Sequence, residues 1–441
     1  MKTALHLGQT LEMRANPFEG DPATALCHTR LGGVLVTDGR IAAVGAADAL
    51  CAAHPTVPRI DHGAGLILPG FVDAHAHAAQ TAILARWSAR LTDWLSSHTF
   101  PEEMRFADPA YAGQMAALYL DLCLDHGTTT AASFCTIHPE SVRALMARAE
   151  VLGLSWVAGR VMMDRNAPAA LTDSAETAYD ESAALIAEWQ GRGRLTYAIT
   201  PRFAPTSSPA QLEAAGALWA AHPGCLMQTH LSEQTEEVAW VKALYPEAAG
   251  YLDVYDRMGL LGPGALMGHA IHLTEAEWAR VAETGTALVH CPTSNTFLGS
   301  GIFAMARAQA ARIPVGLATD VGGGSSFSML RTMAAAFELG QLAGHRMHPA
   351  HLLWLATAGG ARALRLGDRI GALAPGQDAD FIVLDLGSTA AIRAQVARAE
   401  DVWDAVFPTI MMGDDRAIAA VYAGGQALRG QVRPGAAGGP G

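Results

Sequence analysis

The sequence predicts a parallel (β/α)8 barrel together with a small β domain that both ends of the chain build. Within residues 68–374, short apolar runs that end in polar residues alternate with helical segments such as "SPAQLEAAGALWAAH", which is typical of a barrel of parallel strands. On either side of this region the chain carries short β-branched runs with turn residues between them. These outer groups are too short for independent sheets, so we expect them to combine into one domain.

The N-terminal part of the β domain is predicted at 1–67. There, Asp38-Gly39 separates two alternating apolar runs in "GGVLVTDGRIAAVGAADAL", a signal typical of a β-hairpin. The C-terminal part is predicted at 375–430, where "DADFIVLDL" and "AIAAVYAGGQAL" indicate short strands. The last residues, 431–441, are rich in glycine and proline, and we expect them to be disordered.

Composition and charge exclude several classes of partner. Half of the 441 residues are hydrophobic and 16% are charged, so the chain can bury a large core and is not disordered. A formal net charge of −12 argues against a nucleic-acid backbone or an anionic membrane surface as the partner. The six cysteines form no Cys-x-x-Cys pair, and the first residues lack the apolar region of a signal peptide. We therefore expect a soluble, cytoplasmic protein with reduced thiols.

Polar residues at the ends of the apolar runs are the candidates for function. In barrels of this kind, catalytic side chains sit at the C-terminal ends of the strands, which all meet at one face. Reading along the chain, the apolar runs of the predicted barrel end in His75 and His77, Arg202 and Phe203, His230 with Glu233, His269, His290 with Asn295, and Asp320. We expect these side chains to gather at one site.

The histidines and one acid of this group indicate a metal. His75 and His77 occupy positions i and i+2 of a strand and so face the same side, although one His-x-His pair among 17 histidines is weak evidence. With His230 and Asp320, the strand ends offer three imidazoles and one carboxylate, the donor types of a catalytic zinc ion. Asp320 follows an apolar run and precedes three glycines, so we expect it to be buried and to need a partner. Iron accepts the same donors.

The lysines indicate how many metal ions the site holds. Barrel enzymes with two bridged metals commonly use a carboxylated lysine at the end of the fourth strand. The two lysines of this chain are Lys2, at the terminus, and Lys242, on the helix predicted after His230. Neither lysine is predicted to lie at the end of the fourth strand, so we predict a single-metal site.

Several of these residues also have ordinary structural explanations. Glu233 lies in the acidic stretch "HLSEQTEE", where acids commonly begin a helix, yet beside a metal it would serve as a proton shuttle. His269 is either a core residue or an imidazole that polarises the attacking water. His290 and Cys291 are expected to be structural or to shape the pocket.

Four sequence blocks carry a family resemblance. "PGFVDAHAH", "THLSE", "HCPTSN" and "TDVGGG", in this order, resemble the metal-dependent deaminase branch of the amidohydrolase superfamily. Longer blocks, among them "DWLSSHTFPEEMRF", "QTHLSEQTEEV" and "VGLATDVGGGSSFSMLRTM", are similar to the guanine deaminase family, and the resemblance spans roughly 32–428. It implies an amidohydrolase barrel with one zinc ion per subunit, a homodimer, and hydrolysis of guanine to xanthine and ammonia in purine breakdown.

The resemblance also implies a role for each candidate residue. The paired zinc ligands would be His75 and His77, with His230 and Asp320 as the third and fourth. Glu233 would be the proton shuttle and His269 the imidazole that orients the attacking water, while Asp320 would also take part in catalysis. The residues that would contact the substrate are Gln80, Arg202, Phe203, His230, Glu233 and Asp320.

Two alternatives remain open. The first is another single-zinc amidohydrolase that acts on a pterin, a triazine or an oxidised purine; it would share the metal ligands and differ at Gln80, Arg202 and Phe203. The second is a non-catalytic relative that has lost its metal and acts as a binding protein. Such chains typically lack ligands, whereas all four are present here, which disfavours this second alternative.

Overall fold

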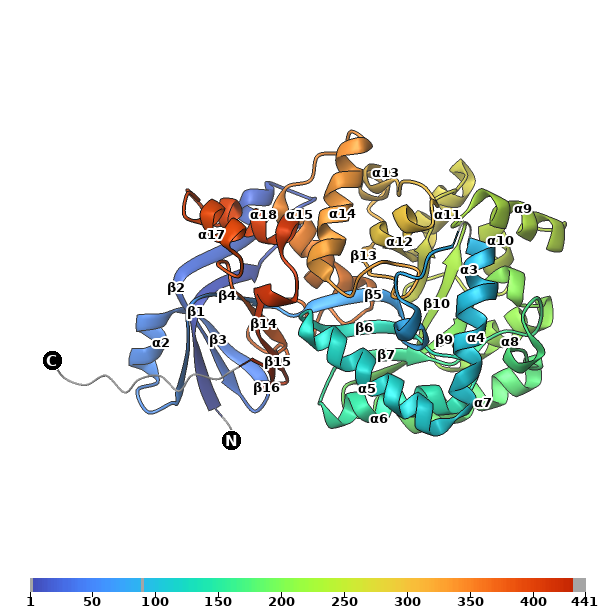
Figure 1. Cartoon of the computed structure of the whole chain (residues 1–441), viewed down its shortest axis with the longest axis horizontal. Coiled ribbons are helices and arrows are strands. Elements are labelled where there is room, and N and C mark those ends of the chain that lie inside the picture. The colour runs from blue at the N-terminus through green and yellow to red at the C-terminus, as the bar shows by residue number, and fades with distance from the viewer. Residues whose placement is uncertain (1–2, 89–90, 431–441) are drawn as a thin grey trace.

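A computed structural model describes residues 3–88 and 91–430 of the chain. Two sheets organise it: a seven-stranded sheet made from both ends of the chain, and a barrel of parallel strands made from the middle (Figure 1). The predicted tail, 431–441, lies outside the described residues. No helix in the described part of the chain has the length and apolar character needed to cross a membrane.

The seven-stranded sheet has the order β16-β15-β14-β4-β1-β2-β3. Its N-terminal strands are β1 (Thr3–Met13), β2 (Leu26–Thr37), β3 (Arg40–Ala46) and β4 (Arg59–Pro69), and its C-terminal strands are β14 (Phe381–Leu384), β15 (Ile418–Ala423) and β16 (Gln426–Arg429). The two groups join where β14 pairs with β4 in antiparallel register. The composite β domain predicted from the sequence is therefore confirmed, while its proposed limits at 67 and 375 stay a prediction.

The hairpin predicted at Asp38-Gly39 connects β2 to β3. Both turn residues have positive φ angles, 49° at Asp38 and 81° at Gly39, as a two-residue hairpin of this kind requires. Thr37 and Arg40 form the closing pair of the ladder. The two turn residues were therefore sufficient to predict this hairpin.

The barrel consists of eight parallel strands, as predicted. In order around the sheet they are β5 (Phe71–His77), β6 (Thr128–Phe134), β7 (Trp156–Gly159), β9 (Leu195–Pro201), β10 (Leu226–Leu231), β11 (Ala265–His269), β12 (Ala287–His290) and β13 (Val315–Leu317), with the short β8 (Val161–Met162) paired to β9. The Asp320 N–H donates to the His75 carbonyl at 3.0 Å, which joins the segment after β13 to β5. This contact draws the first and last strand ends together and nearly closes the ring.

Helices surround the barrel (Figure 1). Side-chain caps begin several of them: Asp108 caps α5 and is followed by Pro109, and Ser208 caps α8 and is followed by Pro209. The helices of the barrel region are α3 (Leu91–Trp94), α4 (Phe100–Met104), α5 (Pro109–Asp125), α6 (Pro139–Val151), α7 (Ala175–Trp189), α8 (Pro209–Ala221), α9 (Thr235–Leu244), α10 (Tyr251–Asp256), α11 (Glu275–Thr284), α12 (Pro292–Phe297), α13 (Met305–Ala310), α14 (Met329–Leu342), α15 (Pro349–Trp354) and α16 (Gly360–Ala363).

The remaining helices flank the seven-stranded sheet or connect to it. They are α1 (Pro22–Ala25) and α2 (Ala47–Ala53) near the N-terminus, and α17 (Ala390–Val396) and α18 (Val402–Met412) near the C-terminus. Figure 1 shows α17 and α18 on the same side of the molecule as the β domain. Between barrel and β domain, Arg194 Nη1 donates to Asp380 at 2.8 Å, which ties the start of β9 to the strand β14 region.

Candidate active site

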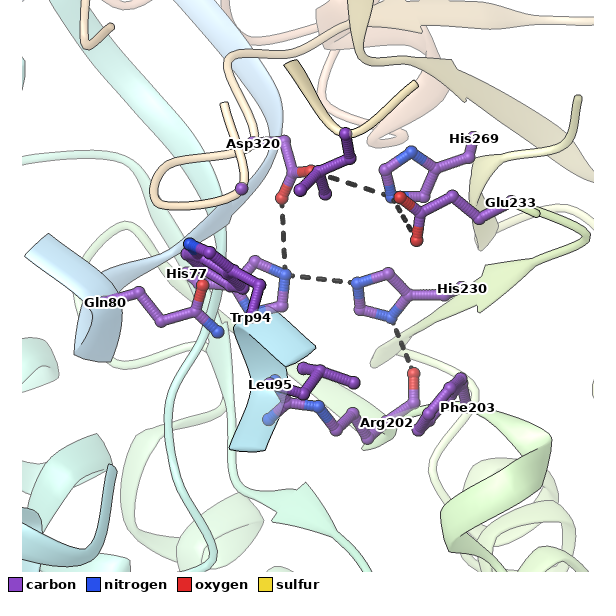
Figure 2. A pocket seen from close by; sticks show the side chains of 12 residues that line it. His77, Gln80, Trp94, Leu95, Arg202, Phe203, His230, Glu233, His269 and Asp320 are labelled. Atoms are coloured by element: carbon purple, nitrogen blue, oxygen red, sulfur yellow. Dashed lines mark hydrogen bonds and ion pairs between the residues drawn. The ribbon is translucent and has the colours of Figure 1, made fainter. Parts of the chain in front are cut away.

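A cavity opens at the C-terminal ends of the barrel strands (Figure 2). The residues that line it lie at the ends of β5, β9, β10, β11 and β13 or in the segments that follow the barrel strands: His77, Gln80, Trp94, Leu95, Arg202, Phe203, His230, Glu233, His269, Leu298, Asp320 and Gly323. His75 lies directly beneath, with 2% of its surface exposed. The structure therefore brings the predicted ligands, the predicted proton-transfer residues and the predicted substrate contacts to one place.

Four of these side chains form a tight cluster. The Nε2 atoms of His77 and His230 lie 3.1 Å apart and face each other in Figure 2. The Asp320 Oδ1 atom lies 3.5 Å from His75 Nε2 and 3.4 Å from His77 Nε2. Burial lowers the pKa of each of the three histidines, which favours neutral imidazoles with free lone pairs. Burial acts to raise the pKa of Asp320, but the neighbouring His75 outweighs it and lowers that pKa to about 2.

The cluster fits a divalent cation. The ligand atoms of His75, His77 and Asp320 all lie within 4.8 Å of one another, and so do those of His75, His230 and His269. Among the described residues, His75 Nε2 is buried without a hydrogen-bond partner. A buried imidazole nitrogen left in this state is costly unless something binds it. Nitrogen and carboxylate donors in this number are the set that zinc or iron accepts.

The residues behind the cluster orient its members. His230 Nδ1 lies 2.7 Å from the Arg202 carbonyl, so the proton resides on Nδ1 and the Nε2 lone pair faces the cluster. Asp73 accepts hydrogen bonds from the backbone N–H groups of Thr319, at 3.0 Å, and His75, at 3.3 Å, and also from the Thr319 hydroxyl. Burial raises the pKa of Asp73 to about 7. Asp73 thereby fastens β5 to the segment that leads to Asp320.

Glu233 faces the cavity and does not cap the helix that follows it. Its Oε1 accepts a hydrogen bond from Ser300 Oγ at 3.1 Å, and its Oε2 lies 3.7 Å from His269 Nε2. Glu237 instead forms the capping box of α9 with Gln234. Its carboxylate also accepts from the Glu233 N–H at 2.8 Å. Burial raises the pKa of Glu233 to about 7, which suits a group that both gives and takes a proton.

His269 ends β11 and points its Nε2 atom into the cavity. Its Nδ1 lies 3.0 Å from Asn295 Oδ1, an acceptor, so Nδ1 carries a proton. Its Nε2 lies 3.7 Å from Asp320 Oδ2. Burial acts to lower the pKa of His269, but the charges of Glu233 and Asp320 outweigh it and raise that pKa. His269 and Asp320 have positive φ angles of 66° and 50°, a conformation that is uncommon for non-glycine residues.

Arg202 and Gln80 line another side of the cavity. Both side chains donate hydrogen bonds to a residue that was not predicted from the sequence. Glu103, on α4, accepts hydrogen bonds from Arg202 Nη1 at 2.9 and 2.8 Å and from Gln80 Nε2 at 2.9 Å. Phe203, next to Arg202, is buried with its ring 6.3 Å from that of His230. Glu103 lies in the block "FPEEMRF", where two successive glutamates gave no indication of which one faces inward. Trp94 and Leu95, which also line the cavity, were missed for a similar reason.

The structure separates His290 from Cys291: His290 lies away from this cavity, whereas the Cys291 sulfur lies within 4.8 Å of ligand atoms of His269 and Asp320. The His290 ring stacks on Phe303, with ring centroids 4.8 Å apart, and borders a separate apolar cavity. Cys291 is fully buried, and burial raises the pKa of its thiol well above the ordinary value. Asn295, which the sequence analysis noted only as the end of an apolar run, lies on α12 and holds His269.

Comparisons with known proteins identify the family of the chain. Residues 66–428 match the model of the amidohydrolase family, and 32–56 match that of an imidazolonepropionase-like composite domain of bacteria. The chain is 44% identical over 366 residues to a guanine deaminase of Escherichia coli (strain K12), which covers 83% of each chain. The solved structure of E. coli guanine deaminase superposes with a TM-score of 0.95 at 40% identity, covering 97% of this chain and 100% of the other. A guanine deaminase from C. acetobutylicum with guanine bound in its active site superposes with a TM-score of 0.88 at 28% identity, covering 97% and 100%.

Proposed function

The chain belongs to the amidohydrolase family, and on that premise we infer that it catalyses the hydrolysis of guanine to xanthine and ammonia. The observation that carries this inference is the cavity itself. It combines a cluster of metal-ligand side chains, a buried acid with a raised pKa and an edge of hydrogen-bond donors, in a chain closely similar to proteins named for this activity. Guanine is a small neutral heterocycle, of the kind that such a partly apolar cavity accepts.

We propose that His75, His77, His230 and Asp320 hold one zinc ion, with iron as the alternative metal. The convergence of their donor atoms and the unpartnered His75 Nε2 support this assignment. When bound, such an ion acts as a Lewis acid that makes a water molecule acidic enough to react at neutral pH. The sequence positions of the two lysines, 2 and 242, are not at the end of the predicted fourth strand, which supports one ion over a bridged pair.

The proton transfers are assigned to the chain's own residues. Asp320 and His269 orient the attacking water, and Asp320 takes its proton as the oxygen bonds to C2 of guanine. Glu233 protonates the adjacent ring nitrogen, takes up the proton of the new C2 hydroxyl and passes it to the departing amino group, so that the C2–N bond breaks, the C2 carbonyl forms and ammonia leaves. The proton on Asp320 then returns to Glu233, which restores both groups. The Ser300 hydroxyl holds the Glu233 carboxyl in position for these transfers. General acid–base assistance of this type contributes roughly a hundred- to ten-thousand-fold.

Three residues are proposed to select the substrate. The Arg202 guanidinium would donate to O6 of guanine; adenine carries an amino group at that position, which would leave the guanidinium unpaired. The Phe203 ring would stack on the purine. Gln80 would contact the heterocycle edge, since its amide offers both a donor and an acceptor. All three side chains line the cavity, which supports these roles.

We further propose that the enzyme is a cytoplasmic homodimer. The cysteine usage supports the compartment, and the family resemblance supports the dimer. The domain limits proposed are 1–67 and 375–430 for the β domain and 68–374 for the barrel.

The experiment is a substrate screen on zinc-loaded protein. Guanine, adenine, a pterin and an aminotriazine are incubated separately, with xanthine followed by chromatography and ammonia by a coupled assay. We expect turnover of guanine with stoichiometric xanthine and ammonia, and little turnover of adenine. Activity on the pterin or the triazine without activity on guanine would assign the chain to the alternative amidohydrolase function.

A further inference from the structure

Glu103 is a buried carboxylate at the recognition side of the cavity. It lies on the five-residue helix α4 with none of its surface exposed, and it is 23 residues from Gln80 and 99 residues from Arg202. Both carboxylate oxygens accept from Arg202 Nη1, and one of them also accepts from Gln80 Nε2. One acid therefore connects the segment after β5 to the segment after β9.

These hydrogen bonds determine which donors remain for a ligand. Arg202 Nη1 donates to both oxygens of Glu103, so Nη2 and Nε are the guanidinium nitrogens left for an acceptor in the cavity. The Gln80 amide is oriented at both ends, because Nε2 donates to Glu103 and Oε1 accepts from the Gly322 N–H at 3.4 Å. Without Glu103 the amide could rotate and exchange its donor for its acceptor.

Glu103 also balances the charge of this side of the cavity. Arg202 is 3% exposed, and a guanidinium buried to this extent requires a counter-ion. The ion pair with Glu103, at 2.8 Å, supplies it from the protein. The edge thus presents directional donors with no net charge. An unpaired guanidinium would instead attract anions strongly, including oxidised purines, which ionise more readily as they gain carbonyl groups.

We propose that Glu103 is a positioning and specificity-determining residue, which aligns Arg202 and Gln80 for a neutral oxopurine and prevents the cavity from retaining anionic purines. The proposal rests on the proposed hydrolysis of guanine and deepens it. It assigns to one carboxylate two separable effects, one on orientation and one on charge. The neighbouring Glu102 provides a matched control, because its carboxylate is also buried but bonds to Arg105, at 3.2 Å, and to the Tyr111 hydroxyl.

The first test compares Glu103→Gln with Glu102→Gln. In Glu103→Gln we expect the KM for guanine to rise about tenfold or more, the scale of a lost charge-assisted hydrogen bond, while kcat changes less. Binding of urate, an anionic purine, should tighten by a similar factor, measured by calorimetry. If Glu103 only supported the fold, its substitution would weaken the binding of both guanine and urate. Glu102→Gln should change neither quantity.

Two further variants separate charge from orientation. Glu103→Asp keeps the charge but shortens the reach, so the KM should rise while urate binding stays as in the unaltered protein. The double variant Glu103→Gln with Arg202→Gln removes both charges, and the gain in urate affinity should disappear. Unchanged urate binding in Glu103→Gln, or tighter urate binding in Glu103→Asp, would overturn the proposal.

A failure of the proposed guanine hydrolysis can be distinguished from a failure of the proposal for Glu103. Failure of the unaltered, metal-loaded enzyme to convert guanine would reject the proposed function. The urate measurement needs no turnover and reports on Glu103 in either case. If Glu103→Gln does not fold, as thermal melting would reveal, Glu103→Asp and the double variant still decide between the two effects.

Discussion

The Nε2 atoms of His77 and His230 face each other 3.1 Å apart, although 153 positions separate the two residues in the chain. His230 carries its proton on Nδ1, which donates to the Arg202 carbonyl, so its Nε2 presents a lone pair toward His77. Two buried imidazoles in this arrangement, with Asp320 Oδ1 3.4 Å from His77 Nε2, are arranged to share a cation.

Removal of one imidazole should remove the metal. His230→Ala leaves three of the four proposed donors, so we expect the metal content to fall to a small fraction of one ion per chain, with turnover lost in parallel. Inductively coupled plasma mass spectrometry of the purified variant measures its metal content per chain. His54→Ala, which alters a half-buried histidine of the β domain, is the control. Full metal content in His230→Ala would remove this residue from the ligand set.

Neutralising Glu233 should separate turnover from metal binding. Glu233→Gln keeps the shape and the contact with Ser300 but cannot shuttle a proton, so kcat should fall roughly a hundred- to ten-thousand-fold while the metal stays bound. The matched control is Glu236→Gln, in the exposed first turn of α9. Steady-state kinetics with parallel metal analysis provides the measurement. Turnover of Glu233→Gln at the unaltered rate would exclude the shuttle role.

His6 should make the β domain sensitive to acid. It is buried between the rings of Phe381 and Tyr422, and burial, with His62 beside it, lowers its pKa to about 3. The unfolded chain takes up this proton near an ordinary pKa of about 6.5, whereas the folded protein does not until about pH 3. The free energy of unfolding therefore falls as the pH drops through this window, by up to about 1.4 kcal/mol per pH unit from this residue.

The variant His6→Gln should remove that contribution. Urea denaturation between about pH 7 and pH 4 measures the free energy of unfolding at each pH. In His6→Gln this free energy should fall less steeply with decreasing pH than in the unaltered protein, because about one proton fewer is taken up on unfolding. His54→Gln, which replaces a half-buried histidine, provides the comparison. Parallel pH profiles for His6→Gln and the unaltered protein would contradict the assignment.

Two glycines should respond to alanine in opposite directions. A Cβ at Gly159, the last residue of β7, would lie 1.7 Å from the Ala198 carbonyl oxygen, so Gly159→Ala should destabilise the barrel by about 1–3 kcal/mol or more. Gly113 lies in the exposed face of α5 with nothing near the position of a Cβ. Gly113→Ala should stabilise the protein by about 0.5–1 kcal/mol. Chemical denaturation of both variants tests the pair, and equal effects would contradict it.

Much of the fold followed from local pattern. The alternation of apolar runs with helical segments predicted the barrel, and the turn residues Asp38 and Gly39 predicted the hairpin between β2 and β3. The composite β domain was predicted because its two groups of strands are each too short to stand alone. Such signals survive in the sequence because each depends on residues that are neighbours in the chain.

The sequence by itself also determined where the proposed metal ligands would meet. Parallel strands bring their C-terminal ends to one face, so polar residues that end apolar runs, such as His77, His230 and Asp320, had to converge there. The tertiary structure alone decided which of two successive acids bonds to Arg202 and Gln80: Glu103 and not Glu102. Successive residues of a helix point about 100° apart, and the rotation of a helix as short as α4 is set by the packing around it, which no local pattern records.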